Sequence, residues 1–178
     1  TIEAKDDLVG AKLTDGKQDI ILGTKDGIAI RFKNEDVREM GRSARGVTGI
    51  RLEKKDFVVG MVALNRENGT ILVVSNLGYG KRSDVADYRI TRRGGKGIIT
   101  MKATDKTGVM IAIREVVDNE DLMIITENGM VIRLKMADIR TMGRNTQGVR
   151  LVKLKEDDKI SDITSIQEDE PAVNGEGQ

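Results

Sequence analysis

The sequence repeats itself every 51 residues without a gap, and this repeat restricts the fold more than any other feature of the chain. The register holds three times, and most of the recurring positions are glycine, arginine or aspartate. They are Gly27, Gly78 and Gly129; Arg31, Arg82 and Arg133; Asp36, Asp87 and Asp138; Arg38, Arg89 and Arg140; Arg42, Arg93 and Arg144; and Gly46, Gly97 and Gly148. Such a period is typical of arrays in which each unit covers the hydrophobic face of its neighbour. We therefore expect three copies of one unit, over residues 19–69, 70–120 and 121–166.

Each copy has the pattern of short β-strands. Asp121–Thr126 is an apolar run of strand length, Asn128–Gly129 is a favoured hairpin turn, and Met130–Leu134 alternates with period two. The first copy adds Val47–Leu52 and Phe57–Leu64 as two further strands. With two Phe, two Tyr and no Trp, the core must consist mainly of Ile, Val, Leu and Met, which suits β-structure. The sequence therefore predicts an all-β fold of four-stranded blades.

Units of this kind stack radially, as the blades of a propeller do. Propellers close with about four to eight blades, whereas only three copies are found here, and Asp7–Leu13 matches only the last strand of a preceding unit. We expect a propeller-like array that forms an incomplete ring, with residues 1–18 as the end of a preceding blade and a linker. Asp36–Met40 and Ala137–Met142 run into glycine within about one and a half turns, so each is predicted to be a 3₁₀ turn or a loop.

The net charge of +1 is the sum of two opposed parts. Residues 156–178 hold eight carboxylates and one cation, whereas residues 1–155 hold 29 cations and 21 carboxylates and are therefore +8. A basic body with an acidic tail is typical of proteins that bind polyanions, and a tail that only improves solubility is equally compatible with this pattern. Residues 167–178 are predicted to be a disordered acidic tail.

Several kinds of chemistry are excluded by composition. The chain has no Cys and no His, which removes disulfides, thiol nucleophiles, imidazole or thiolate metal ligands and the usual general base near neutral pH. Tyr79 and Tyr88 lack an activating partner in the sequence, so neither is expected to be a nucleophile. No apolar run approaches the length of a membrane span, and residues 1–10 do not resemble a signal peptide. We expect a cytoplasmic protein without membrane contacts.

The most basic loop lies in the second copy. Residues 92–97 hold three cations and three glycines, and the segment 81–106 is +5. Glycines let a backbone approach a phosphate closely, while Arg and Lys neutralise its charge. The loop is not a nucleotide-binding P-loop, because Lys96 is followed by Gly97 and then by a strand-like run. The segment therefore predicts a phosphate-contacting surface.

The repeat separates structural from functional positions in this loop. Gly97 recurs in all copies and is better explained as a tight turn between blades, whereas Gly94 and Gly95 do not recur and are assigned to function. Arg93 recurs, which fits either a structural contact or a ring of ligand contacts, and both hypotheses stay open. Three strand arginines are interpreted as members of internal ion pairs with the Asp36 series: Arg31, Arg82 and Arg133.

The segment Thr91–Gly97, reading TRRGGKG, is similar to the Gln-basic-Arg-Gly-Gly-basic-Gly box in the C-terminal domain of the DNA gyrase A subunit, with agreement at six of seven positions. GYGKR at 78–82 and GRNTQGV at 143–149 also resemble this family's blades, and the resemblance spans residues 1–166. Two features depart from the family: Thr91 stands in place of Gln, and the family's principal box lies in its first blade. The chain therefore resembles the C-terminal half of that domain, with a box-like loop in a late blade.

The resemblance implies a β-pinwheel, in which blades exchange strands, and sequence-independent wrapping of double-stranded DNA that supports ATP-dependent negative supercoiling by the gyrase holoenzyme. The partners implied are the breakage-reunion region of gyrase A, together with gyrase B. No catalytic centre and no cofactor are expected in this chain, because ATP and Mg²⁺ would be used elsewhere in a bacterial, nucleoid-associated enzyme. The resemblance also implies that the acidic tail competes with DNA for the basic residues at the rim of the blade array.

Residues from all three copies are expected to contact the DNA. The residues are Arg92, Arg93, Gly94, Gly95, Lys96, Gly97, Lys81, Arg89, Arg42, Arg45 and Arg144. An alternative family is the related C-terminal domain of topoisomerase IV, which has weaker boxes. A different class of function is a propeller that binds proteins, and the basic body and the Gly-Gly loop count against it. A single-strand binder would need more aromatic stacking residues than this chain has.

Overall fold

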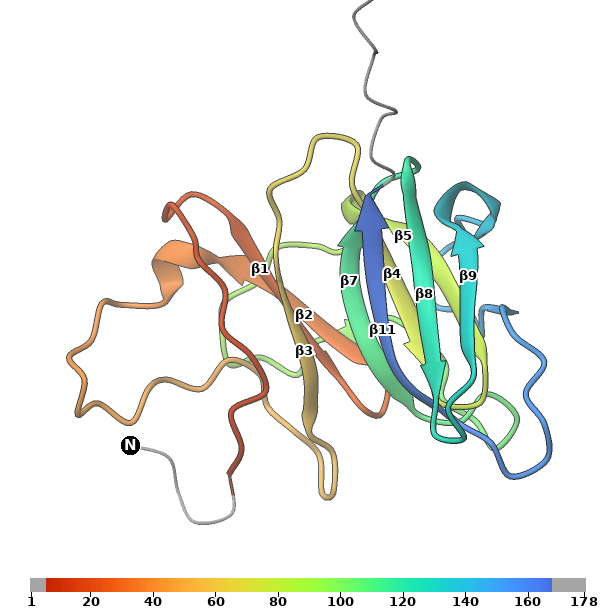
Figure 1. Cartoon of the computed structure of the whole chain (residues 1–178). Helices are drawn as coiled ribbons and strands as arrows, with labels where there is room; N and C mark the ends of the chain where they lie inside the picture. Colours follow the sequence, from red (N-terminus) through yellow and green to blue (C-terminus); the bar gives the residue numbers. More distant parts are fainter. Residues whose placement is uncertain (1–5, 168–178) are drawn as a thin grey trace, which may run out of the picture.

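The computed structural model describes residues 6–167, which form eleven β-strands and three short 3₁₀ helices. The strands are β1 (Asp19–Thr24), β2 (Ile28–Lys33), β3 (Val58–Ala63), β4 (Thr70–Ser75), β5 (Tyr79–Asp84), β6 (Ile98–Ile99), β7 (Met110–Val116), β8 (Glu120–Thr126), β9 (Val131–Lys135), β10 (Val149–Arg150) and β11 (Ile160–Gln167). They make three antiparallel sheets that follow one another in chain order (Figure 1). The predicted all-β fold is confirmed, whereas nearly all of the predicted acidic tail lies outside the described residues.

Each repeat begins with a hairpin. Strands β1 and β2 pair from Asp19 opposite Lys33 to Gly23 opposite Ala29. The turn between them is closed by the Gly27 N–H, which donates to the Thr24 carbonyl at 3.0 Å. Gly27 has φ +80°, a conformation that glycine adopts without the Cβ clash of other residues. The recurring glycine therefore fixes the turn, and with it the register of the hairpin.

The fourth strand of a sheet comes from the following repeat. The first sheet has the order β3-β1-β2-β6, and β6 belongs to the second repeat, with Ile98 opposite Ala29. The second sheet has the order β10-β5-β4-β7, and β10 belongs to the third repeat, with Val149 opposite Gly80. The third sheet has the order β11-β8-β9 within the described residues. Blades that exchange strands, as the resemblance implied, are thus confirmed.

Two predicted strands are absent. Val47–Leu52 has no strand structure, although it matches β6 and β10 in the repeat. Those two strands pair with the hairpin of the preceding repeat, and residues 6–18, which precede β1, contain no such hairpin. Asp7–Leu13 is also not a strand, and the Leu13 side chain is fully exposed. The pairing partner of such a last strand would be the first strand of its own blade, which is not among the described residues. Phe57–Leu64 is confirmed as β3, which begins one residue later and ends one residue earlier.

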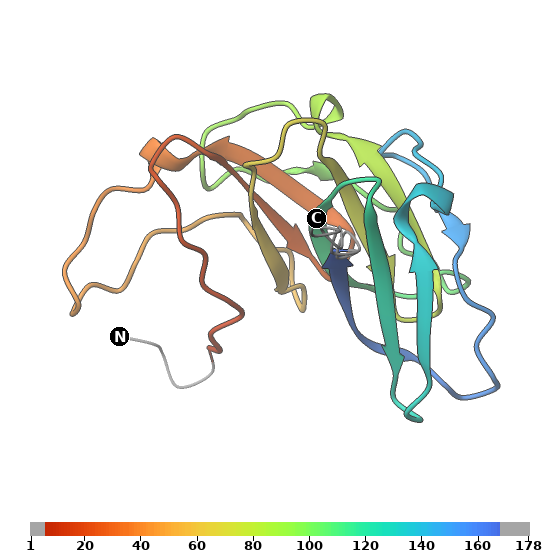
Figure 2. The same ribbon diagram turned by 45° about the horizontal axis from the view of Figure 1, so that its top comes forward.

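The hydrophobic core lies between the sheets. Ile21 and Val62 of the first sheet pack in one cluster with Ile71 and Ile113 of the second. A second cluster joins the middle sheet to the last one, and it includes Leu72, Val116, Leu122 and Ile124. All six residues of β4 are buried, because its sheet has a neighbour on each face. Figure 2 shows this middle sheet, in yellow and green, between the other two.

A 3₁₀ turn follows the second strand of every repeat. The turns are η1 (Asn34–Asp36), η2 (Val85–Asp87) and η3 (Met136–Asp138). The prediction of short 3₁₀ turns here is confirmed, although η1 begins two residues and η3 one residue earlier than expected. The residue after each turn packs differently: Tyr88 and Ile139 are buried, whereas Val37 is 37% exposed. The first two thus contribute to contacts between units that Val37 does not make.

Candidate nucleic-acid interface

The basic loops of the three repeats occupy equivalent places. Each follows a 3₁₀ turn and leads past the strand that is exchanged, over residues 37–52, 88–103 and 139–154; we call these segments the outer loops. They hold four, five and four cations, and the only carboxylate among them is Glu39. The strand exchange lays the second and third outer loops against the preceding sheet, where β6 pairs with β2 and β10 with β5.

Arg93 and Arg144 fasten the outer loops to the preceding repeat. Arg93 Nε donates to the Asp36 carbonyl at 3.2 Å, and its Nη1 donates to the carbonyl of Thr48. Arg144 makes the same two contacts one repeat later, with Asp87 O at 3.1 Å and Ile99 O at 2.8 Å. Of the two hypotheses for the recurring arginines, these contacts favour the structural one.

Gly97 is needed for the strand exchange. Its φ is +76°, and a Cβ atom on Gly97 would lie 2.6 Å from the Ala29 carbonyl oxygen of the strand that β6 joins. Gly148 has the same φ and the same relationship with Gly80 O, at 2.7 Å. No other residue type allows the two backbones to approach so closely, so these recurring glycines are structural.

Gly94 and Gly95 give the second outer loop its shape. Gly94 has φ +79°, and its N–H donates to the Gly49 carbonyl at 2.7 Å. The Gly95 carbonyl accepts from the Arg51 N–H at 2.8 Å. The amide of Gly94 is therefore already bonded within the protein, and the glycine pair holds the loop on its neighbour rather than presenting this amide to a ligand.

Exposed cations remain on the outer loops after these contacts are assigned. Arg42, Arg45, Arg89, Arg92 and Lys96 are exposed or partly exposed, as is required of residues that contact a ligand. One further series of cations is not among the predicted contact residues, although it follows the same 51-residue register and could have been predicted from it. It consists of Arg51, Lys102 and Lys153, all of them exposed, and we call it the junction series.

The junction series lies where successive outer loops meet. The Arg51 N–H donates to Gly95 O, and one repeat later the Lys102 N–H donates to Thr146 O at 3.0 Å. Arg51 and Lys102 therefore each lie beside the outer loop of the next repeat. Backbone hydrogen bonds thus join the first outer loop to the second and the second to the third.

Lys81 does not lie on this surface. It belongs to β5, is completely buried, and its Nζ donates to the Gly143 carbonyl at 2.7 Å and to the Arg144 carbonyl. Burial lowers the pKa of Lys81 to about 8; Asp87 opposes this effect and Arg144 adds to it. The expectation that Lys81 contacts DNA is therefore wrong in geometric terms, because the sequence does not reveal which face of the strand is covered.

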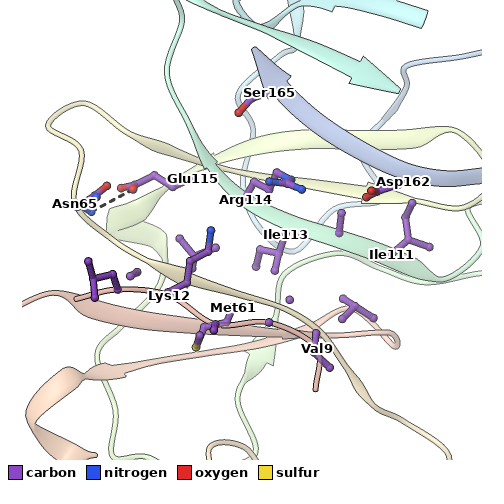
Figure 3. A pocket seen from close by; sticks show the side chains of 18 of the residues that line it. Val9, Lys12, Met61, Asn65, Ile111, Ile113, Arg114, Glu115, Asp162 and Ser165 are labelled. Carbon is purple, nitrogen blue, oxygen red and sulfur yellow. Dashed lines mark hydrogen bonds between the residues drawn. The ribbon is translucent and has the colours of Figure 1, made fainter. Parts of the chain in front are cut away.

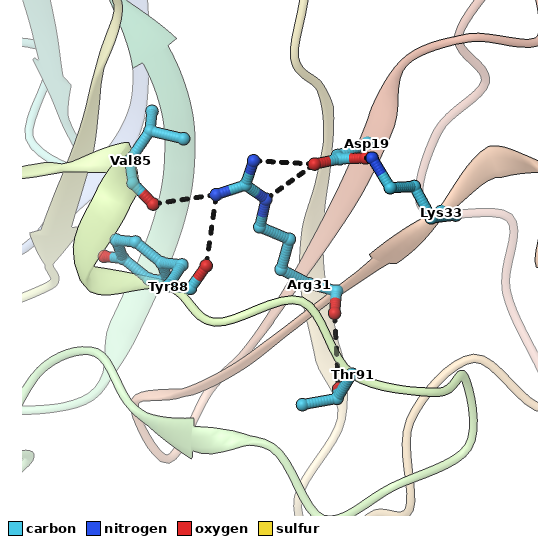
Figure 4. A network of polar contacts seen from close by, with 6 residues as sticks. All are labelled: Asp19, Arg31, Lys33, Val85, Tyr88 and Thr91. Carbon is cyan, nitrogen blue, oxygen red and sulfur yellow. Dashed lines mark hydrogen bonds and ion pairs between the residues drawn. The ribbon is translucent and has the colours of Figure 1, made fainter.

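The strand arginines form internal ion pairs, but not with the Asp36 series. Arg31 pairs with Asp19, and it also donates to the Val85 and Tyr88 carbonyls of the next repeat at 3.0 and 3.1 Å (Figure 4). Arg133 pairs with Asp121, whereas Arg82 bonds to the Thr70 hydroxyl and to Asp118. Asp36, Asp87 and Asp138 are exposed, and the first two accept the arginine bonds described above through their backbone carbonyls.

The tyrosines are held in structural contacts. Tyr88 is fully buried and its hydroxyl bonds to Thr100; burial raises the pKa of Tyr88 against the opposing effect of this bond. The Tyr79 hydroxyl accepts from Arg150, and its ring lies under Lys106 and Arg150. Neither arrangement activates a phenol as a nucleophile.

A cavity lies away from the outer loops, between β3, β7 and residues 9–13 (Figure 3). Its polar lining includes Lys12, Arg114 and Glu115. The Glu115 carboxylate accepts from the backbone N–H groups of Asn65 and Arg66 at 3.2 and 3.3 Å, so it is already engaged. Among the described residues, no three acidic side chains gather in a way that could hold a metal ion.

The sheets and the outer loops define a propeller-type domain with strand-exchanged blades and cationic loops. The family model for the DNA gyrase C-terminal domain, beta-propeller, matches residues 18–65, 69–116 and 120–167, and the chain belongs to this family. The three matched stretches are equivalent in the 51-residue register, so the family unit and the repeat coincide.

Curated relatives support the same family. The chain is 44% identical over 174 residues to the DNA gyrase A protein of Staphylococcus aureus strain MRSA252, and the match covers 97% of this chain and 20% of the relative. It is 46% identical over 165 residues to the same protein of strain NCTC 8325, covering 92% and 19%. The chain thus spans about a fifth of the length of these relatives.

Solved structures share the fold. A DNA gyrase A C-terminal domain superposes with a TM-score of 0.85 at 24% identity, over 93% of this chain and 56% of that chain. A DNA topoisomerase IV C-terminal domain gives a TM-score of 0.86 at 23% identity, over 93% and 52%. These two likenesses do not separate gyrase from topoisomerase IV. In the described residues, no helix is long and apolar enough to cross a membrane.

Proposed function

We propose that this chain binds double-stranded DNA along its outer loops and bends it without reading the base sequence. The observation that carries the proposal is the set of exposed cations on the outer loops, which recurs with the blades, on loops that are joined to one another by backbone hydrogen bonds. Contacts of Arg and Lys with phosphates supply affinity without base contacts, and they offset the cost of bending the duplex.

The cations that serve this function are those that the fold leaves free to reach a ligand. Arg89, Arg92 and Lys96 form the centre of the proposed surface, since this outer loop has five cations and no carboxylate. Arg38, Arg140 and the junction series extend it on either side. Arg93, Arg144 and the glycines act indirectly, because they hold the loops in place.

Single-stranded nucleic acid is a poorer fit to this surface. Binding of single strands usually depends on exposed aromatic rings on which bases stack. Tyr88 and Phe32 are buried, and the Tyr79 ring is occupied by two cations. Phe57 is 55% exposed, but Lys25 lies over its ring.

We further propose that the chain acts as the DNA-wrapping part of a gyrase A protein. Wrapping would present a neighbouring DNA segment for strand passage and so support ATP-dependent negative supercoiling by the holoenzyme. DNA cleavage and ATP hydrolysis, with their Mg²⁺, would then take place in the breakage-reunion region and in gyrase B. The chain itself would contribute binding and no catalytic group, in the bacterial cytoplasm and at the nucleoid.

The direct test is the salt dependence of binding to a relaxed, linear duplex. For phosphate contacts, the logarithm of the affinity falls linearly with the logarithm of the salt concentration, by about 0.9 per contact. The triple variant Arg89→Ala, Arg92→Ala, Lys96→Ala should lower this slope by roughly two to three. An affinity of the unmodified chain that hardly changes with salt would overturn the proposal.

Lys12→Ala is the matched control, because Lys12 is an exposed cation on the wall of the cavity rather than on an outer loop. It should leave the slope unchanged. A protein-binding propeller would instead show little affinity for the duplex in any of these variants.

A further inference from the structure

Lys81 contacts the outer loop of the third repeat from below. Its Nζ donates to two successive carbonyls of this loop, those of Gly143 and Arg144. The Gly143 carbonyl also accepts from the Thr146 hydroxyl at 3.0 Å. A buried ammonium group therefore lies at the centre of the turn that the loop makes.

The other repeats have isoleucine at this position. Ile30 and Ile132 match Lys81 in the 51-residue register. Ile30 is buried beneath the second outer loop, where a Cβ atom on Gly95 would lie 3.4 Å from its Cδ1. The same site beneath an outer loop is thus filled by an apolar side chain in one junction and by a charged one in the next.

The loops above these two residues differ in backbone conformation. Gly94 has φ +79° and bonds through its N–H to Gly49, whereas its counterpart Asn145 does not have a positive φ. Among the described residues, Asn145 N–H makes no backbone bond to Thr100, the counterpart of Gly49 in the preceding outer loop. The third outer loop lacks the glycine pair and therefore the hydrogen bond that Gly94 makes in the second. The Lys81 ammonium group supplies other hydrogen bonds to this loop.

Burial of the Lys81 ammonium group lowers the stability of the fold. Removal of an ammonium group from water is unfavourable unless carbonyl or carboxylate oxygens replace the water. The charged groups near Lys81 are Asp87 on η2 and Arg144 on the loop, and their effects on it are opposite in sign. An isoleucine would avoid this cost, so the gain from the charge must be the conformation that it imposes on the loop.

We propose that Lys81 is a positioning residue that sets the conformation of residues 142–148 and so holds the cations of the third outer loop in place for DNA. Its contribution to DNA binding rests on the proposed function, whereas its effect on the loop does not. In the second outer loop, Gly94 and Gly95, which lie above Ile30, fix the loop conformation instead.

The test replaces Lys81 by the residue of the other repeats. In Lys81→Ile, amide hydrogen exchange at Met142, whose N–H donates to the Arg82 carbonyl at 2.9 Å, should become about tenfold faster, because the Gly143 and Arg144 carbonyls lose their donor and the turn opens more readily. Exchange within residues 91–97 of the same molecule is the internal control and should not change. The salt slope for duplex binding should fall by roughly one to two, about 0.9 for each phosphate that the loop no longer neutralises.

A rescue variant separates positioning from the removal of a charge. Lys81→Ile combined with Asn145→Gly and Thr146→Gly gives the third loop the pair found in the second, and it should restore both slow exchange and most of the salt slope. Unchanged exchange in Lys81→Ile would overturn the proposal. The proposal would also be overturned if the variant with both glycines recovered slow exchange but not the salt slope of duplex binding. If the unmodified chain shows no salt-dependent binding, the proposed function fails, and the exchange data alone decide the role of Lys81 in the loop.

Discussion

The guanidinium group of Arg31 on β2 and the carboxylate of Asp19 on β1 face each other across the first hairpin, with Nη2 and Nε at 2.6 and 2.9 Å from Oδ2. The same guanidinium donates to two carbonyls at η2 of the next repeat. One side chain therefore links the pairing within a sheet to the contact between sheets.

Replacement of Arg31 by Met should lower the free energy of unfolding by about 3 kcal/mol, since it leaves the buried Asp19 carboxylate with Lys33 as its remaining cationic partner. Urea denaturation measures this change. Arg133→Met is the matched control: Arg133 pairs with Asp121 in the same way, but its side chain is 56% exposed, against 17% for Arg31. Equal losses in the two variants would show that the contact with the next repeat adds nothing.

The strand exchange should depend on Gly97 for a steric reason that its counterpart Gly46 does not share. Gly97→Ala should cost about 3 kcal/mol or more, because it combines a positive φ with a Cβ atom 2.6 Å from Ala29 O. Gly46 has φ +83° and open space around its Cα, so Gly46→Ala should cost only about 1 kcal/mol. Thermal or urea unfolding of both variants gives the difference, and similar costs would contradict the close approach.

Arg93 should matter for stability more than its repeat counterpart Arg42. Arg93→Ala removes two hydrogen bonds from a charged donor to carbonyls of the preceding repeat, and the expected loss is about 2 kcal/mol. Arg42 is exposed and, among the described residues, forms no hydrogen bond to a preceding repeat, so Arg42→Ala should change the free energy of unfolding by less than about 0.5 kcal/mol. Parallel denaturation curves test this, and a large effect at Arg42 would refute it.

The buried lysine should give the fold an unusual dependence on alkaline pH. The pKa of Lys81 is lowered from 10.5 to about 8 in the folded state, mainly by burial. Between these values the unfolded chain binds more protons than the folded one, so the free energy of unfolding should rise with pH, by at most about 1.4 kcal/mol per unit. The rise should be visible from pH 8 to 10, above which ionisation of Tyr88 in the unfolded chain acts in the opposite direction.

Lys81→Ile should remove this rise, whereas Lys12→Ala should retain it. Urea denaturation at half-unit intervals of pH is sufficient for the comparison. A rise of the same size in Lys81→Ile would assign the titration to another group.

Local patterns were enough to predict the hairpins and the outer loops. The turn at Gly27 and the alternating strand after it depend on neighbours in the chain, and a gapless repeat transfers such a prediction to every copy. The basic loop at 91–97 was also recognisable, because its composition is unusual within this sequence.

Contacts between repeats could not be predicted in the same way. Proximity in the chain favours Asp36, five residues away, as the partner of Arg31, but the partner is Asp19 on the opposite strand. The spacing of twelve residues between Asp19 and Arg31 recurs between Asp121 and Arg133. In the second copy, Thr70 stands in place of the aspartate, so this recurrence is not evident from the repeat. The burial of Lys81 was equally hidden, since it depends on a loop more than 60 residues later in the chain.

The exchanged strands also determine the order in which the domain can be completed during synthesis. The first sheet lacks its fourth strand until Ile99 has left the ribosome, and the second lacks its own until Arg150 has done so. Completion of these two sheets is therefore delayed until part of the following repeat has been synthesised. An open edge at β2 or β5 is exposed during this interval, and a pause in translation between residues 70 and 98 would prolong the exposure of β2 to pairing with other chains.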